Sequence, residues 1–148
     1  MGFKLGKNKI NKIIYKYFPK DKDELKEILK ERLAKDKNTD LNDINTSQIK
    51  DMRYLFIGLG PHNIDISDWD VSNVINMNYM FLNCKNFNCD LSDWDVSSVE
   101  TMEAMFDGCV SFEGKGLENW DIANVRNMEW IFSKCNSLKK LPSWYKKF

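Results

Sequence analysis

A tandem repeat of about 25 residues constrains the fold of this chain more than any other feature of its sequence. The repeat is marked by four tryptophans that are 25, 26 and 24 residues apart, namely Trp69, Trp94, Trp120 and Trp144. Three complete units carry the first three tryptophans, and a degenerate unit and a truncated unit flank them. In chain order, the five units are 41–65, 66–90, 91–116, 117–140 and 141–148. Because one unit of this length cannot bury its own apolar side, the units are expected to stack.

Each unit combines two hydrophobic periodicities. In the unit 66–90 a spacing of three and four residues predicts a short helix whose apolar side is formed by Val74, Met77, Met80, Phe81 and Cys84. The preceding segment, 66–71, is short, β-branched and aromatic, which predicts a short strand. One strand and one short helix per unit predict an α/β fold, a leucine-rich-repeat-type solenoid over residues 41–148, in which 141–148 is the C-terminal cap.

Residues 1–40 differ from the repeats and are predicted to form an N-terminal helical cap. A helical apolar stripe precedes Pro19 and consists of Ile10, Ile13, Ile14, Tyr17 and Phe18. A second helix is expected from about Lys22 to Lys35, because Asp21 and Glu24 have the spacing of a capping box with Asp in place of Ser or Thr. Stacked repeats need atypical terminal units to cover their open ends, and this pair of helices would cover the first.

The repeat motif resembles that of the BspA-like family of bacterial leucine-rich-repeat surface proteins, whose repeats look like LSxWDVSxVTxMxxMFxxCxxFNxD. Units 66–90 and 91–116 match this pattern almost position by position, and unit 117–140 matches it with Ile122, Ala123 and Ile131 as substitutions. The resemblance covers roughly residues 16–145. It implies a right-handed solenoid with an adhesive or protein-recognition role, often at a bacterial surface, and it implies no catalytic residues.

Charge is distributed unevenly along the chain, although its net charge is +0. Residues 1–53 carry 14 Lys and Arg against 9 Asp and Glu, whereas residues 54–138 carry 4 against 13. A nucleic-acid groove needs a continuous basic face, so the acidic middle argues against nucleic acid and favours a protein partner with a basic surface. The chain has no apolar run near the roughly 20 residues of a membrane span, which argues against a membrane-spanning protein.

The N-terminal 18 residues are basic but lack the apolar segment and the small-residue cleavage site of a secretory signal. The chain as given is therefore expected in the cytoplasm, and the family resemblance suggests the cell surface as the alternative. A composition rich in Asn, Lys and Ile fits an AT-rich bacterium or one of its mobile elements.

Residues that could carry chemistry are sparse. His62 is the only histidine, and no nucleophile elbow, phosphate loop, zincin or kinase motif is present. The sequence therefore predicts a protein that is not an enzyme, with no cofactor, no metal and no small-molecule substrate. Cys84, Cys109 and Cys135 occupy one position of successive units, which favours a buried ladder of reduced thiols over a disulfide or a metal site, since no closely spaced cysteine pair exists.

Aspartates recur on both sides of the tryptophans. Three interpretations are open for them: acceptors for backbone N–H groups at turns, which we favour, an acidic strip that binds a partner, and a divalent-cation site. The tryptophans themselves are expected in the core, and an exposed aromatic strip is the alternative.

Positions that differ between otherwise matching units indicate the surface. Four of these variable positions lie on the outer side of the expected helices and carry large apolar residues, namely Ile75, Tyr79, Leu82 and Trp130. Tyr and Trp are favoured anchors of protein interfaces, although scattered exposed apolar residues are also ordinary. The candidate partner-binding residues are Ile75, Tyr79, Leu82, Trp130, Asp68, Asp70, Asp93, Asp95 and Asp121.

Together these features predict a non-enzymatic protein-binding module of bacterial or mobile-element origin that recognises a protein partner through the solenoid surface. One alternative is a cytosolic inhibitor of a bacterial enzyme, similar in role to an anti-CRISPR protein. The other is a surface adhesion protein or a self-assembling structural protein.

Overall fold

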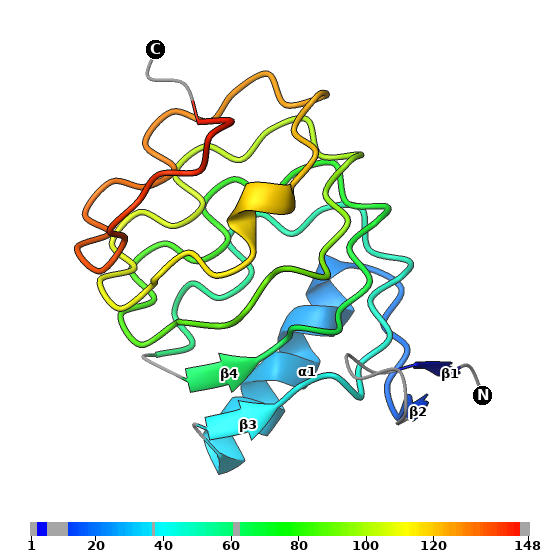
Figure 1. Cartoon of the computed structure of the whole chain (residues 1–148). Helices are drawn as coiled ribbons and strands as arrows, with labels where there is room; N and C mark the ends of the chain where they lie inside the picture. Colours follow the sequence, from blue (N-terminus) through cyan, green and yellow to red (C-terminus); the bar gives the residue numbers. More distant parts are fainter. Residues whose placement is uncertain (1–2, 6–11, 37, 61–62, 146–148) are drawn as a thin grey trace.

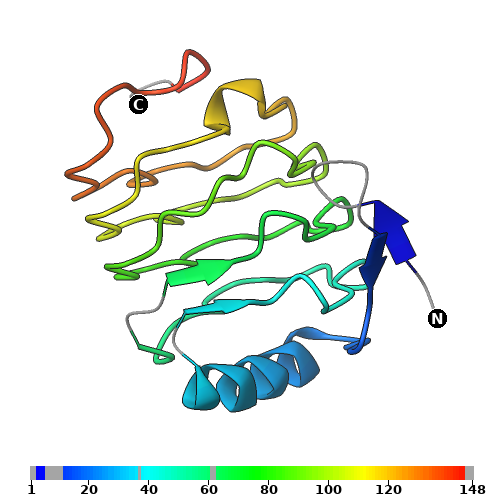
Figure 2. The same ribbon diagram turned by 60° about the horizontal axis from the view of Figure 1, so that its bottom comes forward.

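The computed structural model describes residues 3–5, 12–36, 38–60 and 63–145. Its elements, in chain order, are β1 (Phe3–Leu5), β2 (Lys12–Ile14), α1 (Lys22–Lys35), β3 (Asn38–Asp40), β4 (Asn63–Asp65) and the 3-10 helix η1 (Leu117–Asn119). β1 pairs with β2 in antiparallel orientation, and β3 pairs with β4 in parallel orientation. The repeats form successive layers of chain, and α1 lies beside the first layer (Figures 1 and 2).

The prediction of an α/β leucine-rich-repeat solenoid with a strand and a helix in each unit is wrong. Within the described residues, the single α-helix is α1, which precedes the repeats, and the only parallel strand pair is β3–β4, with three residues in each strand. Later layers are built from turns that are joined by isolated parallel bridges. These bridges link Asp51 to Asn76, Asn76 to Thr101, and Thr101 to Asn127.

The backbone of residues 74–84, which were expected to be helical, shows why no helix forms in the repeats. Tyr79 and Asn83 adopt left-handed backbone angles, with φ of 58° and 59°, which a right-handed helix cannot contain. The N–H groups of Met77, Tyr79 and Phe81 donate to carbonyls of the following repeat at 2.8–2.9 Å, not to carbonyls four residues earlier in the chain. The spacing of three and four apolar residues is therefore produced by tight turns.

The tryptophans form a buried ladder, as expected. Trp69, Trp94 and Trp120 are at most 5% exposed, and the rings of Trp94 and Trp120 stack at 6.4 Å between centroids. Each indole also donates a hydrogen bond to a backbone carbonyl of the preceding unit. The pairs are Trp69 Nε1 to Leu41 O, Trp94 Nε1 to Ile66 O, Trp120 Nε1 to Leu91 O, and Trp144 Nε1 to Leu117 O. The ladder thus binds neighbouring layers through polar as well as apolar contacts.

A second aromatic column runs beside the tryptophans. Phe81 stacks on Phe106 at 5.5 Å, and Phe106 stacks on Phe132 at 6.0 Å. Phe87 of the same layer stacks on Phe81 at 4.1 Å. Burial of a large apolar side chain contributes about 1.5–3 kcal/mol, so these columns supply much of the stability of the stack.

The N-terminal region matches the prediction in its second helix only. α1 spans Lys22–Lys35 with Asp21 as its N-cap, whose carboxylate accepts from the Glu24 N–H at 2.9 Å. The helix expected over residues 10–18 is wrong, because Lys12–Ile14 form strand β2, and Ile14 is 63% exposed. A short apolar stripe that ends at a proline is too short to stabilise a helix on its own. Ile10 lies outside the described residues.

The three cysteines of the predicted ladder, Cys84, Cys109 and Cys135, are buried thiols that form no disulfide, as expected. The thiols of Cys109 and Cys135 donate to the carbonyls of Phe81 and Phe106, each at 3.0 Å. Burial raises the pKa of Cys84 to about 12 and that of Cys135 to about 11, and it also raises the pKa of Cys109. The ladder is therefore held in the protonated, weakly nucleophilic form.

Replacing Trp94 by Phe should lower the free energy of unfolding by about 2–3 kcal/mol, because it removes the buried hydrogen bond from the indole to the Ile66 carbonyl, which then keeps only the Trp69 N–H as a donor, and because it opens a cavity. Urea unfolding followed by circular dichroism measures this change. Trp130→Phe is the matched control, since Trp130 is 61% exposed, and it should change stability little. Equal losses in the two variants would contradict the buried ladder.

Alkylation of the thiols should distinguish the folded chain from the unfolded one. The ordinary thiol pKa is 9.0, so at pH 8 the thiolate fraction of Cys84 should fall about a thousandfold on folding. Mass spectrometry of iodoacetamide-treated protein, with and without urea, measures the ratio. Because the unfolded thiols lose protons that the folded ones retain, stability should fall as pH rises above about 9. Fast labelling of folded Cys84 and Cys135 would contradict this.

Candidate protein-binding surface

The isolated bridges lie along one side of the stack, which presents the side chains that vary most between repeats. We call this side the bridged face and define it by residues 50–57, 75–82, 100–107 and 126–133. Its equivalent positions align in columns across the layers. One column holds Tyr54, Tyr79, Ala104 and Trp130, and an adjacent one holds Arg53, Asn78, Glu103 and Glu129.

The aromatic column owes its position to an unusual backbone angle. All four of its residues have positive φ, at 57° for Tyr54, 58° for Tyr79, 51° for Ala104 and 60° for Trp130. A non-glycine residue in this conformation costs about 1–2 kcal/mol. In the first three of these layers the N–H of this residue donates to the next layer, as Tyr54 does to Asn78 and Tyr79 does to Glu103. The side chains of Tyr54 and Trp130 remain 45% and 61% exposed.

Tyr79 links the aromatic column to a carboxylate. Its ring stacks on that of Tyr54 at 4.9 Å with an interplanar angle of 1°, and its Oη donates to Glu103 Oε1 at 2.8 Å. Asn127 Nδ2 donates to the other oxygen of Glu103 at 3.2 Å. The hydrogen bond to Glu103 is the main cause that raises the pKa of Tyr79 above 10.0. A fixed carboxylate beside stacked aromatic rings suits a cationic Lys or Arg side chain.

The predicted apolar candidates all lie on the bridged face. Ile75 is 42% exposed, and its backbone is paired with the layers on both sides. Leu82 is half-buried at the rim of a depression that is also lined by Phe56 and Cys84. Ile75, Tyr79 and Leu82 share one layer, and Trp130 lies two layers further along the stack. The structure therefore groups these four residues on one side of the molecule.

Two residues of this surface were not found from the sequence. Tyr54 sits in the degenerate unit 41–65, and aligning this unit with the next one places Tyr54 opposite Tyr79. Glu103 carried no signal, because its fixed orientation depends on hydrogen bonds from Tyr79 and Asn127, which belong to two other repeats.

The predicted aspartates behave mainly as turn residues. Asp70, Asp95 and Asp121 each accept the backbone N–H of the residue two positions later, at 3.0 Å. Hydrogen bonds from Ser97 lower the pKa of Asp95. Asp68 is half-buried and Asp93 is exposed. The interpretation as backbone acceptors is confirmed for the three aspartates that follow the tryptophans, whose Oδ1 atoms are already engaged.

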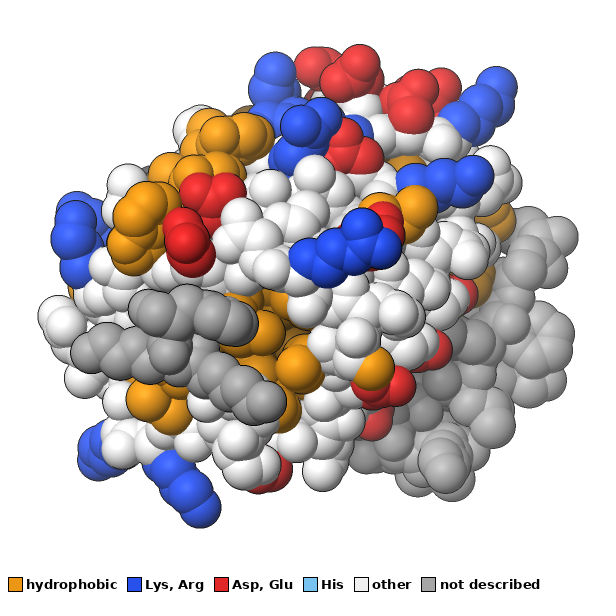
Figure 3. Space-filling model, turned by 90° about the horizontal axis from the view of Figure 1, so that it is seen from above, with side chains coloured by type: hydrophobic (Ala, Val, Ile, Leu, Met, Phe, Trp, Pro, Cys, Tyr) orange, Lys and Arg blue, Asp and Glu red, His pale blue; other side chains and the backbone are white. Residues whose placement is uncertain are grey.

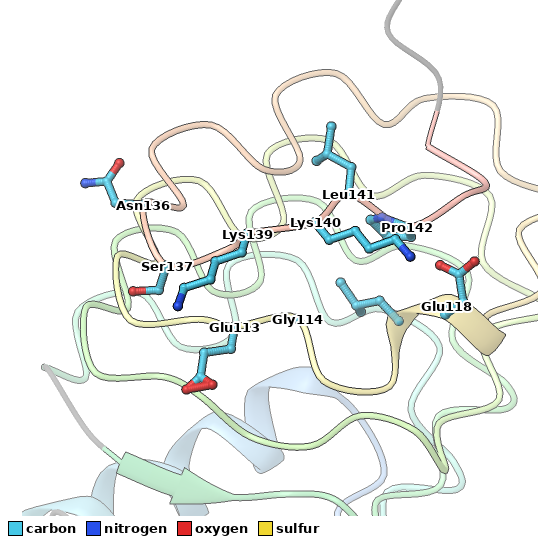
Figure 4. A pocket seen from close by; sticks show the side chains of 10 residues that line it. Glu113, Gly114, Glu118, Asn136, Ser137, Lys139, Lys140, Leu141 and Pro142 are labelled. Carbon is cyan, nitrogen blue, oxygen red and sulfur yellow. The ribbon is translucent and has the colours of Figure 1, made fainter.

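The end of the stack near the last repeats holds a depression of about 730 Å³. Figure 3 looks down on this end and shows apolar side chains near its middle with charged side chains around them. Glu113, Glu118, Lys139 and Lys140 line the depression, and the side chain of Lys140 extends toward Glu118 (Figure 4). Glu118 already accepts hydrogen bonds from Ser143 N and Oγ. The depression is open, and its charged lining residues are two glutamates and two lysines.

Within the part of the chain that the structure describes, no three His, Cys, Asp or Glu residues are grouped so that they could hold a metal ion. His62 lies outside the described residues. None of the helices in the described ranges has the length and apolar character needed to cross a membrane.

Comparison with known proteins gives one family. The family model described as Mycoplasma protein of unknown function, DUF285, matches residues 23–144. The matched range contains α1 from its second residue onward and every complete repeat. No curated protein and no solved structure matches the chain.

Replacing Glu103 by Gln should lower the pKa of Tyr79 toward 10.0, because the negative charge that favours the neutral phenol is removed. The pKa is measured by NMR titration of the tyrosine ring carbons. Glu129→Gln, on the same column, is the control and should leave Tyr79 unchanged. An unshifted pKa in Glu103→Gln would show that Tyr79 does not donate to Glu103.

Proposed function

We propose that this chain, which belongs to the family described as Mycoplasma protein of unknown function, DUF285, is a non-enzymatic module that binds a protein partner through its bridged face. The partner would present a Lys- or Arg-bearing segment to the aromatic column. One observation carries the proposal: the Tyr54–Tyr79 stack lies beside the carboxylate of Glu103, which two side chains hold in place.

The geometry favours recognition of a cation over a purely apolar contact. A guanidinium or ammonium group over an aromatic face contributes about 0.5–2 kcal/mol, and more when it is desolvated. Because Glu103 is already oriented, a cation that binds there does not have to order this side chain. The excess of 13 acidic over 4 basic residues in 54–138 would attract such a partner at longer range.

Trp130 and Ile75 supply the apolar part of the proposed interface. They are 61% and 42% exposed and lie on the same face. Exposed aromatic side chains flanked by polar ones are typical of interface anchors. Affinity would then come from a few anchors on a fixed scaffold and would need no reactive group.

We further propose that the relationship extends to the BspA-like surface proteins, whose repeat motif this chain resembles. Two settings follow from the proposal. A partner in the bacterial cytoplasm would make the chain an inhibitor or regulator of a bacterial protein. A partner outside the cell would make it an adhesion protein.

Binding of a fluorescein-labelled (Gly-Arg)5 peptide, measured by fluorescence polarisation, tests the chemistry of the bridged face. Tyr79→Ala should weaken binding about tenfold, because it removes the stacked ring and releases Glu103. Glu103→Gln should weaken it several-fold. Leu141→Ala is the control, since Leu141 is 50% exposed but lies outside the bridged face.

A (Gly-Glu)5 peptide should bind much more weakly than (Gly-Arg)5 at the same ionic strength. If Tyr79→Ala and Leu141→Ala bind (Gly-Arg)5 equally well, the peptide senses only the net charge of the chain. That result would overturn the proposed role of the aromatic column.

A further inference from the structure

We propose that the last bridged segment, residues 127–134, binds an extended segment of a partner protein through parallel main-chain hydrogen bonds. We call this segment the terminal edge. The proposal is independent of the cation site on the bridged face, because it rests on backbone donors and not on Glu103.

The pattern of hydrogen bonds between layers identifies these donors. Four alternate N–H groups of one layer, those of Met77, Tyr79, Phe81 and Asn83, donate to the next layer at 2.7–2.9 Å. The equivalent groups of the following layer, those of Met102, Ala104, Phe106 and Gly108, do the same at 2.8–3.1 Å. On the terminal edge the equivalent donors are Met128, Trp130, Phe132 and Lys134. Among the described residues, these four N–H groups have no acceptor.

The backbone of the terminal edge already has the conformation that receives a neighbour. Trp130 and Lys134 have φ of 60° and 59°, which match the 58° and 59° of Tyr79 and Asn83, two residues that do have a neighbour. The strained positions are therefore set before anything binds. A ligand that adds here does not have to reorganise the edge, which favours its affinity.

The opposite end of the stack argues against head-to-tail addition of a second copy at the edge. There α1 lies beside the first layer, and Lys26 Nζ donates to the carbonyls of Tyr54 and Ile57 at 3.0 and 2.8 Å. Head-to-tail stacking would require this helix to move away. Two terminal edges cannot pair with each other either, because N–H donors would face N–H donors. The occupant is therefore an extended segment of another protein that supplies carbonyl acceptors.

The columns of the stack also define the side chains of that segment. Opposite Trp130, an aromatic residue would stack as Tyr79 does on Tyr54. Two residues later, a second ring would pack beside Phe132, which stacks on Phe106 at 6.0 Å and also contacts the rings of Trp144 and Tyr145 at 6.1 and 5.4 Å. Lys134 lies near one end of the edge and favours an acidic group beyond the aromatic pair, whereas Arg126, near the other end, already pairs with Glu100 at 3.6 Å.

Residue-resolved hydrogen exchange of the full chain, measured by NMR, tests the edge. In the free chain the amides of Met128, Trp130, Phe132 and Lys134 should exchange at least tenfold faster than those of Met77, Tyr79, Phe81 and Asn83. The probe is a synthetic peptide with the sequence of residues 74–83, VINMNYMFLN, which carries the required aromatic-x-Phe pattern. Saturating peptide should slow exchange at these four edge amides at least tenfold.

A scrambled peptide of the same composition is the control and should give no protection. Equal protection by both peptides, or edge amides that are already protected in the free chain, would overturn the proposal. Protection that grows with protein concentration in the absence of peptide would also overturn it, by placing a second copy at the edge. Tyr79→Ala should retain peptide-induced protection, so failure of the cation site and failure of the edge can be told apart.

Discussion

The structure depends on one interaction, the backbone hydrogen bond that each layer donates to the equivalent position of the next. Tyr79 illustrates the consequence, because it holds a positive φ of 58° while its N–H donates to the carbonyl of Glu103 in the following layer. The strain of this conformation is offset by a hydrogen bond between layers and by burial of the neighbouring Met80 and Phe81, both 0% exposed. Local helix formation would satisfy the same N–H groups but would give up the contact between repeats.

The same interaction explains what the sequence could and could not reveal. The residues of the core were predictable, since Trp94, Met102 and Phe106 recur at matching positions and are buried. The helix α1 was predictable from Asp21 and its apolar spacing. The conformation of the repeats was not, because a spacing of three and four residues arises both from a helix and from consecutive tight turns. No glycine marks the left-handed position at Tyr79 or Trp130, so the usual sequence signal for such a turn is missing.

The candidate surface could be predicted only in part from the comparison of the repeats. Variation between repeats indicated Tyr79 and Trp130, because buried positions keep the same type of residue in each unit, whereas exposed positions differ. The fixed orientation of Glu103 was beyond such reasoning, since its partners Tyr79 and Asn127 lie 24 residues away on either side. The aspartates that follow the tryptophans could have formed an acidic strip that binds a partner. Their carboxylates instead accept backbone N–H groups in turns, which is a common role of Asp.

The two ends of the stack differ because the hydrogen bonds between layers run in one direction along the turns that follow each bridge, although Ile75, Glu100 and Arg126 donate their N–H groups back to the preceding layer. The first layer directs carbonyls outward, and α1 covers this end with Lys26 as a donor. The last layer directs N–H groups outward at Met128 and Trp130, where no described residue accepts them. The proposed partner segment, which supplies carbonyls, therefore matches the N–H groups of the last layer, and the aromatic column reaches this layer at Trp130. The backbone N–H groups that lack a described acceptor thus favour the last layer as the place where a partner segment would add to the stack.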